Sequence, residues 1–507
     1  MIEIDYLEEP KLQFGSYFEH QDTKIGLAEF GPFGRNVDGL HPSEIKLGFI
    51  GTTDTISGAQ DWIGECGSEI ESQNVKTVNK PKPKNVRLKD GLFVDEEEDE
   101  QVRHRFEKIL NRDFVGFNNT DSKFNCRFLT NARWDHSIQS RELDKILDIM
   151  DSKERIRALV DRIDAEVESL ASTSPAPDVI VVALTERMYE EAARARVAGN
   201  FYLDFRRAIK ARAMKWQRPI QLIRPNTVTG KGEMQEKATR AWNFCTAQYY
   251  KAEGVPWRPT TLDADTLFVG ISFYVTQDMN DRLTMRSSLA QAFDCMGQGL
   301  VLRGDPFEWD IEKMGRSPHL TYDAAFKLMN QTIAEYKKVN RRLPPKRVVI
   351  HKTSEFWGNE HPDYNELDGL QEGILAVNPD CDIDLVALRR SKVRLFREGS
   401  YPPLRGTYFS VGGDQHFLYT MGYIPYLETY PGSYVPEAWQ ITKHYGDTPP
   451  KQLCREILAL TKMNVNNCAF ADSRPITLSF SQMIGEIMKH IPENGDIQPH
   501  PHYRFYM

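Results

Sequence analysis

The sequence lacks the patterns that mark membrane and secreted proteins. Its 507 residues contain no uninterrupted apolar run that approaches the ~18–20 residues needed to span a bilayer. The opening residues 1–5 are acidic, whereas a secretory signal has a basic start followed by an apolar core. We therefore expect a cytoplasmic protein that does not associate with membranes.

Cysteine is scarce and scattered. The chain has 7 cysteines, far apart in the sequence, and none forms a C-x-x-C pair. This pattern argues against a zinc module or a disulfide framework and favours buried free thiols in a reducing compartment. The cysteines are Cys66, Cys126, Cys245, Cys295, Cys381, Cys454 and Cys468.

Several well-known catalytic signatures are absent as well. There is no G-x-x-x-x-G-K-[ST] phosphate loop, no H-E-x-x-H, no G-x-S-x-G and no kinase signature. The 12 histidines are dispersed, and the single H-x-H at His500 and His502 is more typical of a mobile tail than of a metal site. These absences argue against P-loop nucleotide hydrolases, zincin proteases, α/β-hydrolases and protein kinases.

Length and charge define the remaining possibilities. At ~100–200 residues per domain, the chain is long enough for two to four domains. Its 27% charged and 40% hydrophobic residues are typical of a folded globular protein. The 64 basic and 72 acidic residues give a net charge of −8, which excludes a uniformly basic nucleic-acid coat but permits a local basic pocket.

The first part of the chain reads as an arm followed by an α/β unit. Residues 1–42 are short apolar patches separated by turn formers, and 46–52 resemble a buried strand. Residues 76–100 have no apolar period and contain the basic run 80–84 and the acidic run 95–100, which favours a solvated loop.

Helices and strands are predicted to alternate after this loop. Apolar spacing predicts helices over 138–170, 203–215 and 233–251, with strands at 178–184 and 219–223. Such alternation is typical of a parallel sheet covered by helices.

A second unit is predicted to begin after the Pro-Trp-Arg-Pro segment near residue 256. Apolar runs predict strands in it, and helical spacing predicts further helices. The predicted strands are 266–274 and 347–351, and the predicted helices are 321–338, 450–462 and 480–490.

One group of polar residues has the composition of a phosphate site. Arg206 and Lys210 lie four residues apart on a predicted helix, Gln221 is in the next strand, and Asn243 and Lys251 lie on the following helix. Two cations, an amide and a third cation suit a terminal phosphate, which needs charge-assisted donors from several directions. On spacing alone, solvated cations on amphipathic helices would be the more common explanation.

The segments around these residues resemble the MID domain of Argonaute proteins, and segments further along resemble the PIWI domain of the same family. Residues 7–10 and 26–32 resemble the linker strands that precede MID. The MID-like segments are 209–210, 219–224, 241–245 and 249–257, and the PIWI-like segments are 268–273, 405–409, 417–423, 430–436, 460–466 and 475–478.

The resemblance covers nearly the whole chain and implies its fold and domains. It implies an α/β protein in which a Rossmann-like MID domain precedes an RNase H-like PIWI domain. Residues 1–42 would form linker-like strands, 43–258 the MID domain and 259–507 the PIWI domain.

In Argonautes the MID pocket holds the 5′-phosphate of a guide strand. The resemblance implies that Lys210, Gln221 and Lys251 bind this phosphate, together with Arg206, whose position often stacks on the first base, and with Asn243. The position four before Lys251, where many relatives have lysine, is Ala247. In bacterial relatives a Mg²⁺ ion commonly completes the pocket with the C-terminal carboxylate, which here would be that of Met507.

The resemblance also identifies the positions where a PIWI nuclease would carry its metal-binding carboxylates. These positions are Ser272, Thr353 and Gln482, all neutral. Neutral side chains cannot supply the charge that two Mg²⁺ ions require, so we expect target cleavage to be lost. Asp278 or Asp414 could in principle restore a metal site, but nothing in their spacing supports this.

A chain of this length has no room for the N and PAZ domains of a long Argonaute, so it resembles a short prokaryotic Argonaute. Such proteins act with a partner that contains an APAZ region and an effector domain of the TIR, sirtuin or nuclease type. The implied function is recognition of complementary single-stranded DNA through a 5′-phosphorylated guide RNA, which activates a TIR-APAZ NADase in abortive infection. A guided nuclease with an atypical metal site and a scaffold with a decayed pocket are the alternatives.

Overall fold

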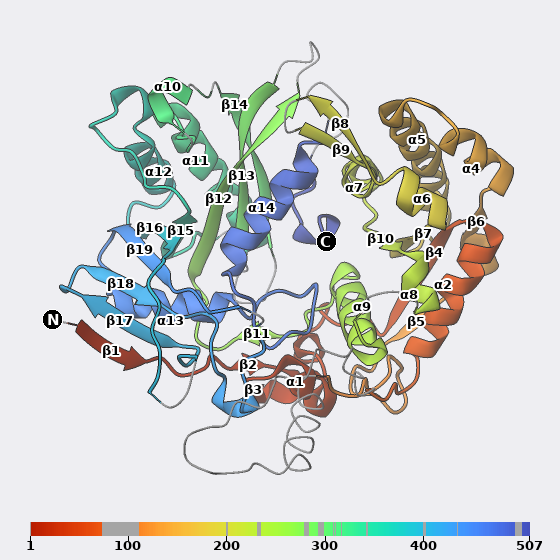
Figure 1. Ribbon diagram of the computed structural model, residues 1–507, viewed down its shortest axis with the longest axis horizontal. Coiled ribbons are helices and arrows are strands. Elements are labelled where there is room, and N and C mark those ends of the chain that lie inside the picture. The colour runs from red at the N-terminus through yellow and green to blue at the C-terminus, as the bar shows by residue number, and fades with distance from the viewer. Residues whose placement is uncertain are drawn as a thin grey trace, which may run out of the picture.

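The computed structural model describes the chain in segments (Figure 1). These are residues 2–72, 111–198, 201–230, 235–277, 283–292, 299–307, 309, 311–315, 317–340, 343–398, 402–432, 434–491 and 499–507. The charged runs 80–84 and 95–100, together with Cys295 and Asp278, lie outside the described residues.

A five-stranded parallel sheet organises the first half of the chain (Figure 1). Its central strands are almost wholly buried, as expected for a parallel sheet covered on both faces. The parallel sheet predicted from the alternating pattern is therefore confirmed. The strands, in spatial order, are β10 (Ile220–Ile223), β7 (Val179–Ala183), β4 (Glu44–Gly51) and β5 (Arg127–Leu129), with β6 (Asp135–Ser137) also pairing with β4.

The helices of this half differ in one respect from the sequence prediction. The single helical stretch predicted over 138–170 is two helices, α4 (Ser140–Leu147) and α5 (Ser152–Ala171). The helix is interrupted there because Asp151 caps the start of α5: its side chain accepts hydrogen bonds from the main-chain nitrogens of Lys153 and Glu154. The other elements are α2 (Thr53–Cys66), α6 (Glu186–Glu191), β8 (Arg194–Ala198), β9 (Phe201–Asp204), α7 (Phe205–Ala213), α8 (Pro225–Thr229) and α9 (Lys237–Lys251).

A nine-stranded mixed sheet organises the second half. Three parallel strands form its centre, β12 (Thr266–Gln277), β15 (Arg347–Lys352) and β16 (Asp382–Arg390), and antiparallel strands flank them. The flanking strands are β13 (Leu283–Ala292) and β14 (Val301–Phe307) on one side, and β19 (Trp439–Tyr445), β18 (Gln415–Leu418), β17 (Thr407–Val411) and β1 (Ile2–Tyr6) on the other.

Helices cover both faces of this sheet. Alternate residues of β12 point to opposite faces, so Leu267 and Val269 join one core cluster while Phe268 joins another. The helices are α10 (Ile311–Met314), α11 (Tyr322–Val339), α12 (Glu366–Leu375), α13 (Pro450–Leu460) and α14 (Ile476–Met488), and α14 packs on β12 and β13.

The N-terminal arm belongs structurally to the second half. Strand β1 pairs with β17, while β2 (Leu12–Gln13) pairs with β3 (Glu19–His20) and β11 (Arg258–Pro259), next to α1 (Thr23–Phe30). Figure 1 shows the arm running beneath both lobes, with β1 at the outer edge of the larger sheet.

Buried charges anchor this arm. The carboxylate of Glu9 accepts from Arg405 Nε at 2.8 Å and from Lys462 Nζ at 2.8 Å, and Arg405 is only 1% exposed. Burial alone would raise the pKa of Glu9, but the two cations lower it more, so its pKa lies below its usual range. The arm is therefore fixed to the second lobe by an ion network as well as by strand pairing.

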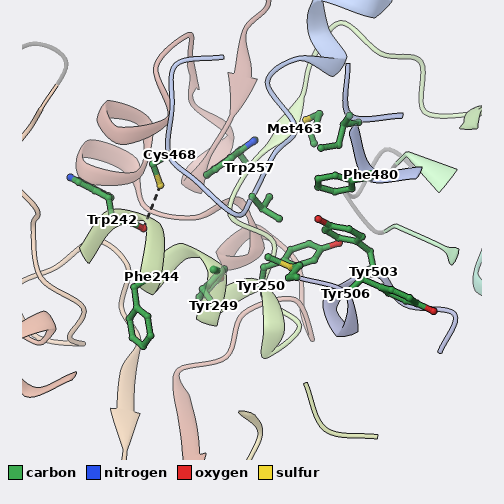
Figure 2. Packing of buried hydrophobic residues seen from close by; sticks show 14 of the residues in the cluster. Trp242, Phe244, Tyr249, Tyr250, Trp257, Met463, Cys468, Phe480, Tyr503 and Tyr506 are labelled. Atoms are coloured by element: carbon green, nitrogen blue, oxygen red, sulfur yellow. Dashed lines mark hydrogen bonds between the residues drawn. The ribbon is translucent and has the colours of Figure 1, made fainter. Parts of the chain in front are cut away.

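One hydrophobic cluster joins the two lobes (Figure 2). Trp242 and Tyr250 come from α9, and Phe480 comes from α14. The C-terminal Tyr503 stacks on Phe480 with a centroid distance of 3.7 Å, and the thiol of Cys468 lies 3.5 Å from the carbonyl oxygen of Trp242. The two lobes therefore share a continuous core.

The C-terminal segment is packed against the protein, so the prediction of a mobile tail is wrong. His500 stacks on Phe505 with a centroid distance of 3.7 Å, and His502 forms a β-bridge with Leu300. The six cysteines in the described ranges are buried and free, as predicted. Within those ranges, no helix is long and apolar enough to cross a membrane.

Candidate functional site

A cavity of about 1070 Å³ lies between the two lobes. Its walls come from α7, β10 and α9 of the first lobe, and from α14 and the last two residues of the second. Five cationic side chains line it, namely Arg206, Arg207, Lys210, Arg224 and Arg240. The cavity therefore concentrates positive charge on a protein whose net charge is −8.

Helix α7 presents the first pair of cations. Asp204 caps the helix by accepting from the main-chain nitrogen of Arg207 at 3.0 Å. Arg206 and Lys210 are four residues apart and so lie on one face of the helix, both lining the cavity. Lys210 is only 6% exposed, whereas Arg206 stays accessible to water in the cavity.

Strand β10 and helix α9 supply the next two residues. Lys251 Nζ donates to Gln221 Oε1 at 2.6 Å and to the carbonyl oxygen of Ile220 at 3.0 Å. Gln221 Oε1 also accepts from Gln248 Nε2 at 2.9 Å. Lys251 is 2% exposed, so its ammonium group is held beneath the cavity wall by these acceptors.

The end of the chain meets this group. Lys210 Nζ donates to the main-chain oxygen of Met507, and the charge of Lys251 lies close enough to Lys210 to lower its pKa. The structure therefore brings Lys210, Gln221, Lys251 and Met507 together, from α7, β10, α9 and the C-terminal segment.

Asn243 is used differently. Its Oδ1 accepts from the main-chain nitrogen of Cys468 at 2.9 Å, and its Nδ2 donates to Gln235 Oε1 at 3.0 Å. Asn243 lines the cavity, but these hydrogen bonds join α9 to the loop at 468 rather than to the two lysines. Ala247, also on α9, lines the cavity as well.

Burial and mutual repulsion weaken the protonation of the two lysines. Burial, followed by the charge of Arg206, lowers the pKa of Lys251 to about 7. Burial, followed by Lys251 and Arg206, lowers the pKa of Lys210 well below its usual value, and Asp204 only partly opposes this. A bound anion would oppose both effects and favour the charged forms of the two lysines.

Three of the five cationic residues that line the cavity were not identified from the sequence as site residues: Arg207, Arg224 and Arg240. Arg207 donates to Glu486 at 2.5 Å across the two lobes, a contact that no sequence pattern reveals. Arg224 directly follows β10, and the carboxyl ends of parallel strands are where α/β sheets bind ligands, so this rule offered a signal. Arg240 is on α9, and its Nε is buried without a hydrogen-bond partner in the described part of the chain.

The three neutral positions of the second lobe come from β12, from the end of β15 and from α14. Gly270 of β12 pairs with His351 of β15; Ser272 lies two residues further along β12, and Thr353 directly follows the last residue of β15. Ser272 Oγ donates to the carbonyl oxygen of Ser481 at 2.7 Å, and Ser481 directly precedes Gln482 on α14.

A close helix–strand approach creates this arrangement. A Cβ atom on Gly270 would lie 1.9 Å from the carbonyl oxygen of Thr477, so glycine is required for α14 to pack there. His351 Nδ1 lies 2.8 Å from Thr477 Oγ1, and burial lowers the pKa of His351 to about 3. The first turn of α14 is therefore fixed on β12, and the helix begins at Ile476, before the predicted residue 480.

Two arginines contact these positions. Arg474 Nη1 donates to Gln482 Oε1 at 2.9 Å, and Arg389 Nε donates to the carbonyl oxygen of Thr353 at 3.3 Å. Both arginines are exposed. In the described segments, no three His, Cys, Asp or Glu residues are grouped so that they could hold a metal ion.

Comparison with solved structures identifies the fold. Clostridium butyricum Argonaute, bound to a guide DNA and a 19-mer target DNA, superposes with a TM-score of 0.58 over 97% of this chain at 15% identity. The fold is that of an Argonaute. The Aquifex aeolicus Argonaute structure gives a TM-score of 0.52 over 98% of this chain at 14% identity, and Marinitoga piezophila Argonaute with a 5′-OH guide RNA gives 0.53 over 99% at 11% identity.

The sequence comparison points to the same proteins. The chain is 26% identical to the protein argonaute of Aquifex aeolicus (strain VF5) over 192 residues, which cover 35% of this chain and 24% of that protein. No protein-family model matches the sequence. The chain spans 54% to 59% of the length of the three solved Argonautes.

Proposed function

We propose that the cavity binds the 5′-phosphate of a short guide RNA. The observation that carries this proposal is that Lys210 and Gln221 line an arginine-lined cavity, with Lys251 buried directly behind Gln221. A terminal phosphate needs charge-assisted donors from several directions, and these residues come from three separate elements. Arg206, at the cavity face of α7, would contact the first nucleotide. Asn243 would keep the opposite wall of the cavity in place.

The guide would direct the protein to a complementary single-stranded DNA, with base pairing supplying sequence specificity and the protein holding the backbone. Among the solved Argonautes, that of Clostridium butyricum is bound to a guide DNA and a target DNA, and that of Marinitoga piezophila to a 5′-OH guide RNA. The choice of RNA for this chain is part of the proposal.

Recognition without cleavage would require a second chain to produce the response. Ser272, Thr353 and Gln482 offer hydroxyl and amide groups where a nuclease needs carboxylates. We propose that pairing activates a TIR-APAZ partner to hydrolyse NAD⁺ in prokaryotic immunity by abortive infection, with a sirtuin-type or nuclease effector as the alternative. Pairing can shift such a partner only through a difference in affinity between its two states.

A Mg²⁺ ion at the guide end is a further part of this proposal. The main-chain oxygen of Met507 already faces a cation, the ammonium group of Lys210, so its position fits a metal ligand. Met507 would hold the ion together with the phosphate. The ion would neutralise the negative charges of the phosphate and of the C-terminal carboxylate. Ala247, at the position where many relatives have lysine, supplies no positive charge for this.

The first experiment is to purify the chain with its co-expressed partner and end-label the nucleic acid that co-purifies. Short RNA that labels only after phosphatase treatment would support a 5′-phosphorylated guide. RNA that labels without phosphatase would indicate a 5′-OH guide and contradict the phosphate proposal. Retention of no nucleic acid at low salt, where phosphate contacts are strongest, would favour the scaffold alternative.

Guide affinity should depend on pH through Lys251. Its pKa of about 7 in the empty pocket means that phosphate binding takes up a proton above that pH. Binding of the phosphate raises the pKa of Lys251, so the lysine contributes fully to guide affinity below its free pKa and progressively less above it. The affinity should therefore fall roughly tenfold from pH ~7 to pH ~8.5. Fluorescence anisotropy with a 5′-phosphorylated guide measures this; a 5′-OH guide is the control and should show little change.

Target binding should depend on the arginines beside the neutral positions. Replacing Arg389 and Arg474 with alanine removes two exposed cations near Thr353 and Gln482, and should weaken retention of target DNA by roughly tenfold at low salt. Guide affinity should be unchanged. Replacing Arg127 and Arg212, two exposed cations elsewhere, removes the same charge. Equal loss with both pairs would attribute the effect to net charge alone.

A further inference from the structure

The outer edge of the larger sheet is an open strand. Strand β1 is the first in the nine-strand order, so its only strand partner within the described residues is β17. All five of its residues are exposed, with Ile2 63% and Ile4 64% accessible. An exposed edge strand with apolar side chains is a ready template for another strand, and proteins usually protect such edges.

The hydrogen-bond pattern shows which main-chain groups are available. The main-chain nitrogen of Leu7 donates to the carbonyl oxygen of Gly406 at 2.9 Å, opposite it in the antiparallel pair. Hydrogen-bonded pairs alternate along an antiparallel ladder, so Asp5 and Glu3 bond to β17 while the N–H and C=O groups of Ile4 point away from the sheet. The residue that presents an apolar side chain thus also presents main-chain groups that no strand in the described ranges takes up.

The two faces of β1 differ in charge. Ile2, Ile4 and Tyr6 share one face, where Ile4 lies opposite Phe409, itself stacked on Phe417 at a centroid distance of 4.6 Å. Glu3 and Asp5 share the other face, and Lys451 of α13 pairs with Asp5. The edge therefore presents an apolar face that continues a small core cluster and an acidic face behind it.

The edge is also held rigidly. Glu9, three residues beyond the strand, is fixed by Arg405 and Lys462. A strand that is already ordered loses little conformational entropy when a second strand is added. This distinguishes β1 from a loose terminal segment.

We propose that β1 accepts an extended segment of a different protein chain, one in which apolar residues alternate with lysine or arginine. Apolar residues would cover Ile2 and Ile4, and cations would face Glu3 and Asp5. A second copy of this chain fits less well, because an antiparallel pair of β1 strands would place Glu3 and Asp5 of one copy opposite those of the other. The proposal deepens the proposed partnership and rests on it for the existence of a second chain, but not on guide binding.

The test uses full-length protein and a capped peptide of about seven residues that alternates valine with lysine. The variant Ile4→Pro removes one outward N–H, and proline is tolerated on an edge strand at such a position, so the fold should persist. Wild-type protein should bind the labelled peptide about tenfold more tightly than Ile4→Pro. In the variant, the added strand loses one main-chain hydrogen bond, and the proline ring disturbs its packing on β1. Ile4→Val, which keeps the N–H and the β-branched side chain, should bind like wild type.

Charge reversal provides the second arm. Glu3→Lys should weaken binding of the valine–lysine peptide and strengthen binding of a valine–glutamate peptide, whereas Ile4→Pro should weaken both. Equal binding by wild type and Ile4→Pro would overturn the proposal, as would self-association of wild type that Ile4→Pro abolishes, since a second copy would then be the occupant. Guide binding measured on the same proteins tests the proposed function separately.

Discussion

Replacing Lys210 and Lys251 together with methionine should weaken binding of a 5′-phosphorylated guide by about a hundredfold or more. We expect each lysine to exchange a present acceptor for the phosphate and to give it a charge-assisted hydrogen bond. Such a bond is worth about 1.5–3 kcal/mol, and about 1.4 kcal/mol corresponds to tenfold in affinity. Methionine keeps the length of the side chain, so the effect reports the charge rather than a new cavity. Anisotropy with 5′-phosphorylated and 5′-OH guides separates the phosphate contribution from the rest.

The same double variant should be more stable than wild type when no guide is bound. Burial lowers the pKa of both lysines, which means that folding disfavours their charged forms. Removing both groups relieves that cost, and the melting temperature of the guide-free protein should rise. The control replaces Lys237 and Lys327, which are 39% and 55% exposed, with methionine. A double variant that retains the preference for a 5′-phosphate would refute the assignment of the pocket.

Replacing Glu9 with glutamine should lower the free energy of unfolding by about 3–5 kcal/mol. Removing the carboxylate leaves Arg405 and Lys462 buried with uncompensated charge, and breaking a buried ion pair from one side costs about that much. Burial already lowers the pKa of Lys462 to about 8 in the presence of Glu9, so the variant should release this proton at still lower pH. Urea denaturation at neutral pH measures the change.

Glu8 is the matched control for this substitution. It precedes Glu9, is exposed, and makes no ion pair with the described residues. Glu8→Gln should change the stability by no more than about 0.5 kcal/mol, as is usual for surface substitutions. If both variants were equally stable, the arm would be held by strand pairing alone.

Patterns local in sequence gave most of the fold. The continuous apolar run at 178–184 and the helical spacing at 203–215 and 233–251 predicted the strand β7 and the helices α7 and α9 within a few residues. The break between α4 and α5 was missed because apolar periodicity continues through it, and only the cap at Asp151 marks the new start. Periodicity records which face is buried and is insensitive to a short interruption.

The pocket was predictable only in part, for a different reason. Arg206 and Lys210 share a helix, so their spacing revealed a common face. Gln221 and Lys251 were included for their chemistry, and the family resemblance then assigned them to phosphate binding. Arg207 contacts Glu486, which is 279 positions away, and no local pattern encodes such a pairing. The role of Asn243 as a support for the loop at Cys468 likewise depends on tertiary packing.

The aromatic cluster that joins α9 to α14 has a mechanical consequence (Figure 2). Parting the two lobes like a hinge would pull Tyr250 of α9 away from Tyr503 and expose large, closely packed rings to water, at a cost comparable to partial unfolding. We therefore expect the lobes to melt together in a single calorimetric transition. To accommodate a nucleic-acid duplex, the segments around the cavity mouth would have to rearrange while the two lobes keep their relative position.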